Sequence, residues 1–178
     1  MARPAILYLI LILSTLTAFA GEKLPSPALP ELTAKPYGST TYALTVRDVE
    51  GNEVKLSDFK GKTIFLHYWA TYCQACVSEL PSLQRLRDSL HDRDDIAFLF
   101  VSKDDDPAQV KDFLQKRGLD FPVYMRIEAS KEFPSGGIPV TYVVDRNGTI
   151  RVRYSEPAAW DSSSAQEYLQ AVADVTSR

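Results

Sequence analysis

Residues 63–76 read TIFLHYWATYCQAC, an apolar run that ends in the only two cysteines of the chain, Cys73 and Cys76. The first seven residues are almost continuously apolar and rich in aromatic side chains, which is typical of a buried strand. After Cys73 the leucines recur at helical spacing. A Cys-x-x-Cys pair between a strand and a helix is typical of a redox centre rather than a metal site.

The spacing of the two cysteines predicts their roles. If the helix begins near Cys73, the pair lies at positions i and i+3 and faces one side. The two Cα atoms are then about 5–6 Å apart, a separation that a disulfide permits. Cys73 would lie at the helix N-terminus, where unpaired amide groups and the helix dipole favour a thiolate. We predict that Cys73 is the nucleophile and that Cys76 resolves the mixed disulfide.

Two other uses of the cysteines compete with redox chemistry. A structural disulfide closing so short a loop would remove little unfolded-state entropy, worth roughly 2 kcal/mol, so this reading is disfavoured. A closed zinc site needs four ligands, and the chain offers only two thiols and two distant histidines. Copper(I) stays open as an alternative, because soft thiolates suit it. No cofactor is expected.

The rest of the chain predicts an α/β fold with a mixed central sheet flanked by helices. Asp106 should cap one helix and Asp161 or Ser162 the last one. Residues 145–148 should form a hairpin turn, because Asn147-Gly148 accepts the positive φ angles that such turns require. The predicted strands are residues 42–49, 53–56, 64–69, 96–101, 121–124, 140–144 and 149–154, and the helices cover residues 74–91, the stretch between Asp106 and Gly118, and the C-terminal region.

The N-terminal region predicts export. Residues 1–20 carry one early charge, Arg3, then an uncharged apolar run that ends in Ala18-Phe19-Ala20, as a cleaved signal peptide does. An uncleaved membrane anchor is the alternative. We expect a Pro-rich linker over residues 21–38 and one domain over residues 39–178. Export would place this domain in the bacterial periplasm or on another extracytoplasmic face, where disulfides persist.

The charge of the chain argues against a nucleic-acid partner. The formal net charge is −3, and removal of residues 1–20 takes away one arginine and leaves −4. The sequence also has no cluster of lysines and arginines that could neutralise a phosphate backbone.

Three segments together resemble the exported thioredoxin-like proteins of the TlpA/ResA group. They are residues 69–76 followed by Glu79, the hairpin segment 48–62, and residues 137–148. The resemblance implies a thioredoxin-like fold with an added N-terminal β-hairpin, and the activity of a thiol-disulfide oxidoreductase. The chain departs from the group at Gln74-Ala75, which lacks a proline before the second cysteine, and at Tyr72, where tryptophan is usual.

The resemblance also implies how substrates bind. Ile138-Pro139 should be a cis peptide bond beside the cysteines, and the Ile138 backbone should pair with an incoming cysteine peptide. We expect Trp69 and Tyr72 to flank the cysteines and to contribute to a docking surface.

Two titratable residues are candidates for proton transfer. Glu79 shares the helical face of Cys76, and in ResA-like proteins a glutamate here influences thiol acidity; the alternative is an ordinary glutamate favoured by the helix dipole. His67 falls where thioredoxin keeps a buried carboxylate. A hydrogen-bonded strand histidine is the favoured interpretation, and a proton relay to Cys76 is the alternative.

The resemblance favours a reductant of protein cysteines, such as those of apocytochrome c or of a copper-site protein. The partners would be proteins with cysteines or disulfides, and a membrane thiol donor would recycle the protein. A periplasmic copper(I) chaperone that uses the same thiols is the alternative. A peroxidase of the peroxiredoxin type fits poorly, because its nucleophile normally lacks a second cysteine three residues on.

Overall fold

A computed structural model describes residues 23–31 and 33–175 of the chain, so the predicted export signal lies outside the described residues. An eight-stranded mixed sheet forms the middle of the fold, in the order β1-β8-β7-β4-β5-β6-β2-β3. The central pairs β4–β5 and β5–β6 are parallel, and the other pairs are antiparallel. The strands are β1 (Gly38–Ser39), β2 (Thr45–Asp48), β3 (Glu53–Lys55), β4 (Thr63–Trp69), β5 (Ile96–Ser102), β6 (Val123–Arg126), β7 (Val140–Val144) and β8 (Thr149–Tyr154).

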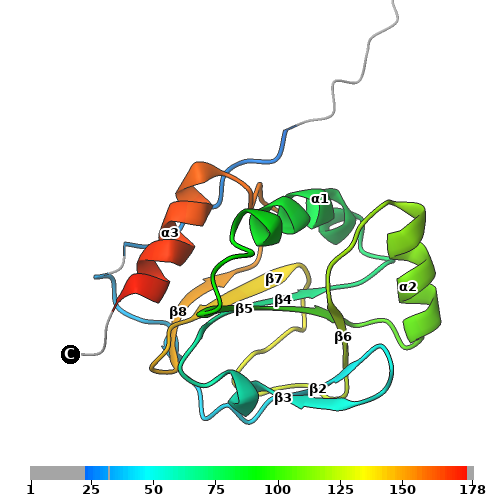
Figure 1. The fold of residues 1–178 in the computed structure, drawn as a ribbon, viewed down its shortest axis with the longest axis horizontal. Helices are drawn as coiled ribbons and strands as arrows, with labels where there is room; N and C mark the ends of the chain where they lie inside the picture. The colour runs from blue at the N-terminus through cyan, green and yellow to red at the C-terminus, as the bar shows by residue number, and fades with distance from the viewer. Residues whose placement is uncertain (1–22, 32, 176–178) are drawn as a thin grey trace, which may run out of the picture.

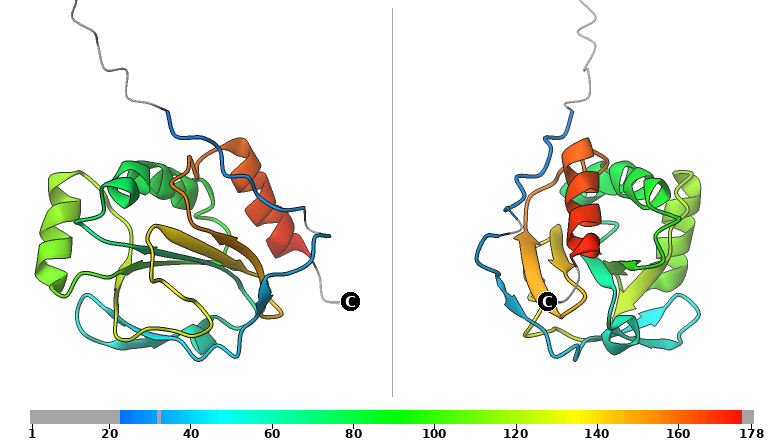
Figure 2. Two further views of the ribbon diagram at one scale, coloured as in Figure 1. Left: turned by 180° about the vertical axis from the view of Figure 1, so that it is seen from behind. Right: turned by 60° about the vertical axis from the view of Figure 1, so that its left-hand side comes forward.

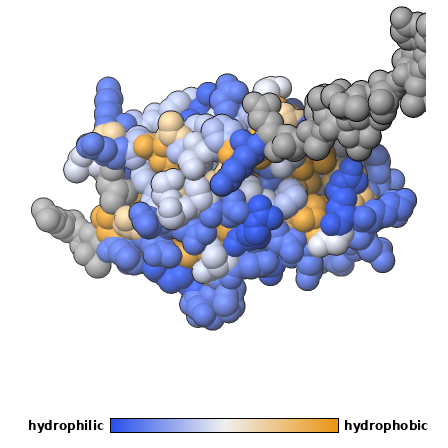
Figure 3. Space-filling view, turned by 90° about the horizontal axis from the view of Figure 1, so that it is seen from above, coloured by the Kyte–Doolittle hydropathy of each residue, from blue (hydrophilic) through white to orange (hydrophobic). Residues whose placement is uncertain are grey.

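Three helices pack on one face of this sheet. The last two strands of the sheet, the hairpin β2–β3, lie below the other face of the central strands (Figure 1). They are α1 (Gln74–Ser89), α2 (Pro107–Lys116) and α3 (Ser163–Asp174), and a short 3-10 helix, η1 (Leu56–Phe59), follows β3. Seen from above, the helical face is largely hydrophilic, with hydrophobic side chains in small separate patches (Figure 3). The apolar sides of the helices therefore point into the sheet.

Each face of the sheet has its own hydrophobic core. The alternation of side chains along β4 sends Phe65 and Trp69 toward the helices, and sends Ile64, Leu66 and Tyr68 toward the opposite core. All seven residues of β4 are buried, which confirms the predicted buried strand. This strand leads directly into the cysteine segment, so the site is attached to a completely buried strand.

Most of the predicted elements are present. Asp106 caps α2 by accepting the amide N–H of Ala108 at 2.8 Å, as predicted. Ser162 is the residue before α3, although its side chain makes no capping hydrogen bond. The strand predicted over residues 42–49 is shorter, because Tyr42 has a φ of 63°, a conformation that interrupts an extended strand.

Residues 145–148 form the turn between β7 and β8, as predicted. The predicted backbone conformation is only partly present, because Gly148 adopts a positive φ, at 81°, whereas Asn147 does not. Asp145 stabilises this loop with its carboxylate, which accepts the amide N–H groups of Asn147 and Thr149 at 2.9 Å each.

The segment predicted as a linker contacts the domain. Pro25 accepts a backbone hydrogen bond from Ala159, Tyr37 donates one to Ile150, and Pro27 is buried. Seen from behind, the segment runs past α3 and on to β8 (Figure 2). Its residues thus cover the end of the sheet formed by β8, and β1 adds a short pairing there. No helix among the described residues has the length and apolarity that a membrane crossing needs.

Candidate active site

Cys73 and Cys76 form a disulfide with Cα atoms 5.3 Å apart, within the separation expected from their spacing. Cys73 is the N-cap residue of α1 and is partly exposed, whereas Cys76 is completely buried one turn further on. An incoming thiol or disulfide can therefore reach only the Cys73 sulfur from solvent.

The helix N-terminus acts directly on the Cys73 sulfur. The amide N–H of Cys76 donates a hydrogen bond to Cys73 Sγ at 3.2 Å. In the reduced protein this N–H and the helix dipole would stabilise a negative charge on the Cys73 sulfur. Cys76 has no such environment, because it lies among apolar side chains of the core.

The loop before β7 faces Cys73. Cys73 Sγ lies 3.7 Å from the carbonyl oxygen of Ile138, and the Ile138-Pro139 peptide bond is cis, as expected. Gly136 and Gly137, just before it, are exposed, so the backbone here is open to an incoming chain. Lys103 anchors the loop, since its Nζ donates a hydrogen bond to the carbonyl oxygen of Ser135 at 2.7 Å.

Asp104 anchors the other side of the cysteine segment, and the sequence reasoning did not identify it. Its carboxylate accepts the Thr71 amide N–H at 2.9 Å and the Thr71 hydroxyl at 2.6 Å. It also accepts the Ser102 hydroxyl at 2.6 Å. Asp104 lies just beyond the end of β5 at Ser102, and β5 runs parallel to β4, so the neighbouring ends of these strands could have indicated the contact.

Glu79 is completely buried behind the cysteines, one turn after Cys76 on α1. Its Oε2 accepts the amide N–H of Ala158 at 3.0 Å and the indole N–H of Trp160 at 2.9 Å. Burial raises the pKa of Glu79 to about 8, although these two hydrogen bonds oppose the shift. Glu79 is therefore not a solvated glutamate of the first helical turn.

His67 is also completely buried, on the β4 face that looks toward α1. Its Nδ1 lies 2.8 Å from the Thr141 hydroxyl, because Thr141 on β7 is its direct partner in the antiparallel pair. Its Nε2 lies 3.5 Å from Glu79 Oε1. Burial lowers the pKa of His67 to about 3, so the ring is neutral at pH 7.

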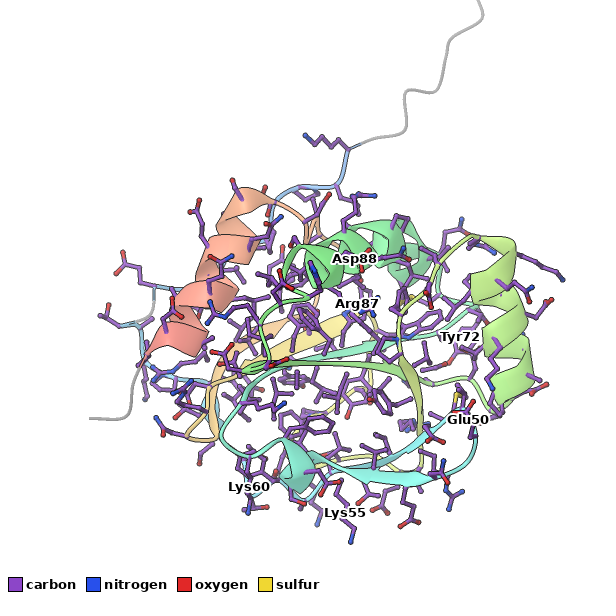
Figure 4. All side chains as sticks on the ribbon, in the orientation of Figure 1. Glu50, Lys55, Lys60, Tyr72, Arg87 and Asp88 are labelled. Atoms are coloured by element: carbon purple, nitrogen blue, oxygen red, sulfur yellow. A yellow bond between two sulfur atoms is a disulfide. The ribbon has the colours of Figure 1, made fainter. Side chains whose placement is uncertain are left out.

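The two aromatic residues near the cysteines, Trp69 and Tyr72, differ in their exposure to solvent. Trp69 was expected on the docking surface, and the structure corrects this: its side chain is 0% exposed and packs against Phe113 and Phe121. The strand alternation turns Trp69 into the helical core, so a partner cannot touch it. Tyr72 is 70% exposed, and Figure 4 labels it on the side of the molecule where α2 and the hairpin residue Glu50 lie.

The structure also places two residues beside Glu79 that the sequence did not single out. Trp160 and Ala158 come from the loop between β8 and α3, about 80 residues after Glu79 in the chain. No local pattern marks them as partners of a helix residue. Among residues 23–31 and 33–175, no three His, Cys, Asp or Glu side chains form a group that could hold a metal ion.

Comparisons with known proteins agree with this geometry. The model of the AhpC/TSA family matches residues 29–153. Thiol-disulfide oxidoreductase ResA of Geobacillus thermodenitrificans is 30% identical over 142 residues, which cover 79% of this chain and 81% of the relative.

Solved structures show the same fold. StoA of Bacillus subtilis matches with a TM-score of 0.57 at 25% identity, over 70% of this chain and 93% of StoA. A secreted thiol-disulfide isomerase of Corynebacterium glutamicum matches with a TM-score of 0.63 at 20% identity, over 75% of this chain and 84% of that protein. The expected thioredoxin-like fold is confirmed, and these relatives do not favour the copper(I)-chaperone alternative.

Proposed function

The chain belongs to the AhpC/TSA family and is a thiol-disulfide oxidoreductase, and from this we propose that it is an exported reductant of protein disulfides. The observation that carries the proposal is the asymmetry of the cysteine pair. Cys73 is partly exposed and its sulfur accepts an amide N–H at the start of α1, whereas Cys76 is buried.

This asymmetry assigns a role to each sulfur. The Cys73 thiolate attacks a disulfide of the substrate protein, and one substrate sulfur leaves as a thiolate. Cys76 then loses its proton and attacks Cys73, which releases the second substrate thiolate. The substrate disulfide gains two electrons, and the Cys73–Cys76 pair is oxidised to the disulfide that the structure contains.

The substrate chain binds along the loop before β7 in this proposal. The Ile138 carbonyl lies 3.7 Å from Cys73 Sγ, so an extended peptide that presents its sulfur to Cys73 can pair with the Ile138 backbone. Tyr72 supplies an exposed aromatic side chain on the other side of Cys73. Pro139 shapes the loop, and the buried Trp69 supports the segment from below.

The direction of electron flow and the place of action complete the proposal. We place the protein in the periplasm or on another extracytoplasmic face, after removal of residues 1–20, as the sequence predicts. Its substrates are the cysteines of an exported protein such as apocytochrome c or a copper-site protein. A membrane protein with a reactive dithiol returns the pair to its reduced form.

A trapping experiment tests this function in the host organism. In the Cys76→Ser variant the mixed disulfide on Cys73 cannot be resolved, so substrate proteins should accumulate as adducts that a reductant releases. The Cys73→Ser variant is the matched control and should trap nothing. If no adduct accumulates on Cys76→Ser while Cys73 still reacts with an alkylating agent, the proposed function is wrong.

A further inference from the structure

The core behind the cysteines contains two ionisable side chains with no access to solvent, Glu79 and His67. Glu79 Oε1 and His67 Nε2 lie 3.5 Å apart. Neither atom has a hydrogen-bond partner among the described residues. A buried polar atom without a partner is rare and costly, so two of them facing each other need an explanation. A single proton between the two atoms satisfies both, after a small closing movement of the side chains.

The neighbouring contacts indicate where this proton resides. Glu79 Oε2 already accepts two N–H groups, from Ala158 and Trp160, as the carbonyl oxygen of a carboxylic acid can. Oε1 is then the hydroxyl oxygen, and it donates to His67 Nε2. A neutral ring that accepts at Nε2 carries its own proton on Nδ1, which donates to the Thr141 hydroxyl. Every polar atom of the group has a partner in this arrangement, and no charge is buried.

We propose that Glu79, His67 and Thr141 form one proton-holding unit for Cys76, in which His67 is a positioning residue that changes tautomer when Glu79 gains or loses its proton. When Glu79 is ionised, Oε1 must accept, so the ring proton moves to Nε2. Nδ1 then becomes an acceptor, and the Thr141 hydroxyl must turn to donate to it. The tautomer change follows from the contacts alone, while its connection to Cys76 rests on the proposed function.

The exchange of the proton with Cys76 balances in both directions. When a donor thiolate attacks Cys73, the Cys73–Cys76 bond breaks and Cys76 leaves as a thiolate, which takes the proton from Glu79. When Cys76 later resolves a substrate, its thiol returns the proton to the Glu79 carboxylate before it attacks Cys73. Cys76 and Glu79 are neighbours at i and i+3 on α1, whose Cβ atoms lie about 5–6 Å apart.

Among residues 23–31 and 33–175, no charged side chain contributes to the pKa shifts of His67 and Glu79. The ring of Phe65 on β4 stacks on His67, and the ring of Phe100 on β5 meets it edge-on. The other polar contacts of the two side chains are with Thr141 on β7 and with Ala158 and Trp160 from the loop before α3. Cys76 precedes Glu79 by three residues on α1. Burial, opposed at Glu79 only by the hydrogen bonds of Ala158 and Trp160, accounts for both shifts: the pKa of Glu79 rises to about 8 and that of His67 falls to about 3.

The tautomer of His67 can be measured by ¹⁵N NMR of the two ring nitrogens. The chain has only two histidines, and the other, His91, is exposed, so a His91→Asn variant leaves one histidine to follow. In the disulfide form we expect a neutral Nδ1–H ring at pH 7 and a change to Nε2–H with a midpoint at about pH 8. The Glu79→Gln variant cannot ionise, and its amide N–H can still donate to Nε2, so it should keep the Nδ1–H tautomer throughout.

Two outcomes would contradict the proposed unit: a protonated His67 ring at pH 7, or a His67 tautomer that does not change between about pH 6 and about pH 10. The link to Cys76 is tested by repeating the titration on the dithiol form. Because Cys76 takes the proton from Glu79 on reduction, Glu79 is ionised in the dithiol form, so the ring should already carry its proton on Nε2 at pH 7. A ring that keeps the Nδ1–H tautomer at pH 7 in both forms would disprove the link. Neither result depends on trapping a substrate, so each can fail separately from the proposed function.

Discussion

At the scale of single residues, burial rather than residue type determines what the side chains around the cysteines can do. His67 and Glu79 would both be charged or partly charged in water at pH 7, and both are neutral in the core. Trp69 and Tyr72 are both aromatic, yet one is completely buried and the other is 70% exposed. The sequence therefore identified these positions as important but could not assign Trp69 to the core.

Trp160 offers a test of the contact that holds Glu79. We expect Trp160→Phe to lower the free energy of unfolding more than Trp69→Phe does, by about 1 kcal/mol. The reason is that the Trp160 indole donates to Glu79 Oε2, whereas the Trp69 indole N–H has no hydrogen-bond partner among the described residues. Both side chains are at most 1% exposed, so the loss of buried volume is similar.

Urea unfolding of the two variants measures the difference. A second readout separates the hydrogen bond from packing: without the indole donor, the pKa of Glu79 should rise further in Trp160→Phe and stay unchanged in Trp69→Phe. If Trp69→Phe were the more destabilising variant, the contact between Trp160 and Glu79 would contribute little to stability.

At the scale of elements, local patterns specified the strand, the helix and the cap well. Seven consecutive buried residues form β4, and the leucines of α1 point into the core as their spacing predicts. The turn between β7 and β8 was predicted at residues 145–148, but a positive φ was wrongly expected at Asn147 as well as at Gly148, because the position of the positive φ depends on loop length and on a neighbouring segment. That segment is residues 37–42, which run beside β8 and bring Tyr42 against Gly148.

Gly148 should therefore be intolerant of substitution. Its φ is positive, and an added Cβ would lie 3.0 Å from the Tyr42 ring. We expect Gly148→Ala to destabilise the protein by about 1 kcal/mol or more. Gly38→Ala is the matched control, since Gly38 has no positive φ and an added Cβ would meet nothing within 4 Å. Thermal unfolding of both variants checks this, and equal melting temperatures would contradict it.

At the scale of the whole molecule, the buried pair makes stability depend on pH in a particular way. The pKa of Glu79 rises from 4.5 to about 8 on folding, so this group stabilises the protein below pH 4.5, and the contribution is lost as the pH rises to 8. The pKa of His67 falls from 6.5 to about 3, so its contribution is present above pH 6.5 and is lost as the pH falls to 3.

The two effects together predict a plateau. Between pH 4.5 and pH 6.5 the folded and unfolded chains hold equal numbers of protons on these two groups, so their joint contribution is flat. Stability should fall by roughly 2 kcal/mol between about pH 6.5 and about pH 8. Denaturant unfolding across this range measures it, and the Glu79→Gln variant should lack the fall. An equal fall in Glu79→Gln would assign it to other groups.

The sequence by itself determined the elements and the reactive pair, because these depend on neighbours in the chain. A continuous apolar run produced β4, the leucine spacing produced α1, and the interval of three residues placed Cys73 and Cys76 within disulfide distance. The family resemblance supplied the loop with Ile138 and Pro139. All of this information lies within short stretches of sequence.

Only the tertiary structure decided what stands behind the cysteines. Glu79 meets His67 across the space between α1 and β4, and the register of β4 with β7 places Thr141 on the other nitrogen of the ring. Trp160 arrives from a loop about 80 residues away. Packing between α1 and the sheet excludes water from Glu79 and His67, and this exclusion shifts the pKa values of both. A local sequence pattern cannot predict such a shift, because it depends on residues far apart in the chain.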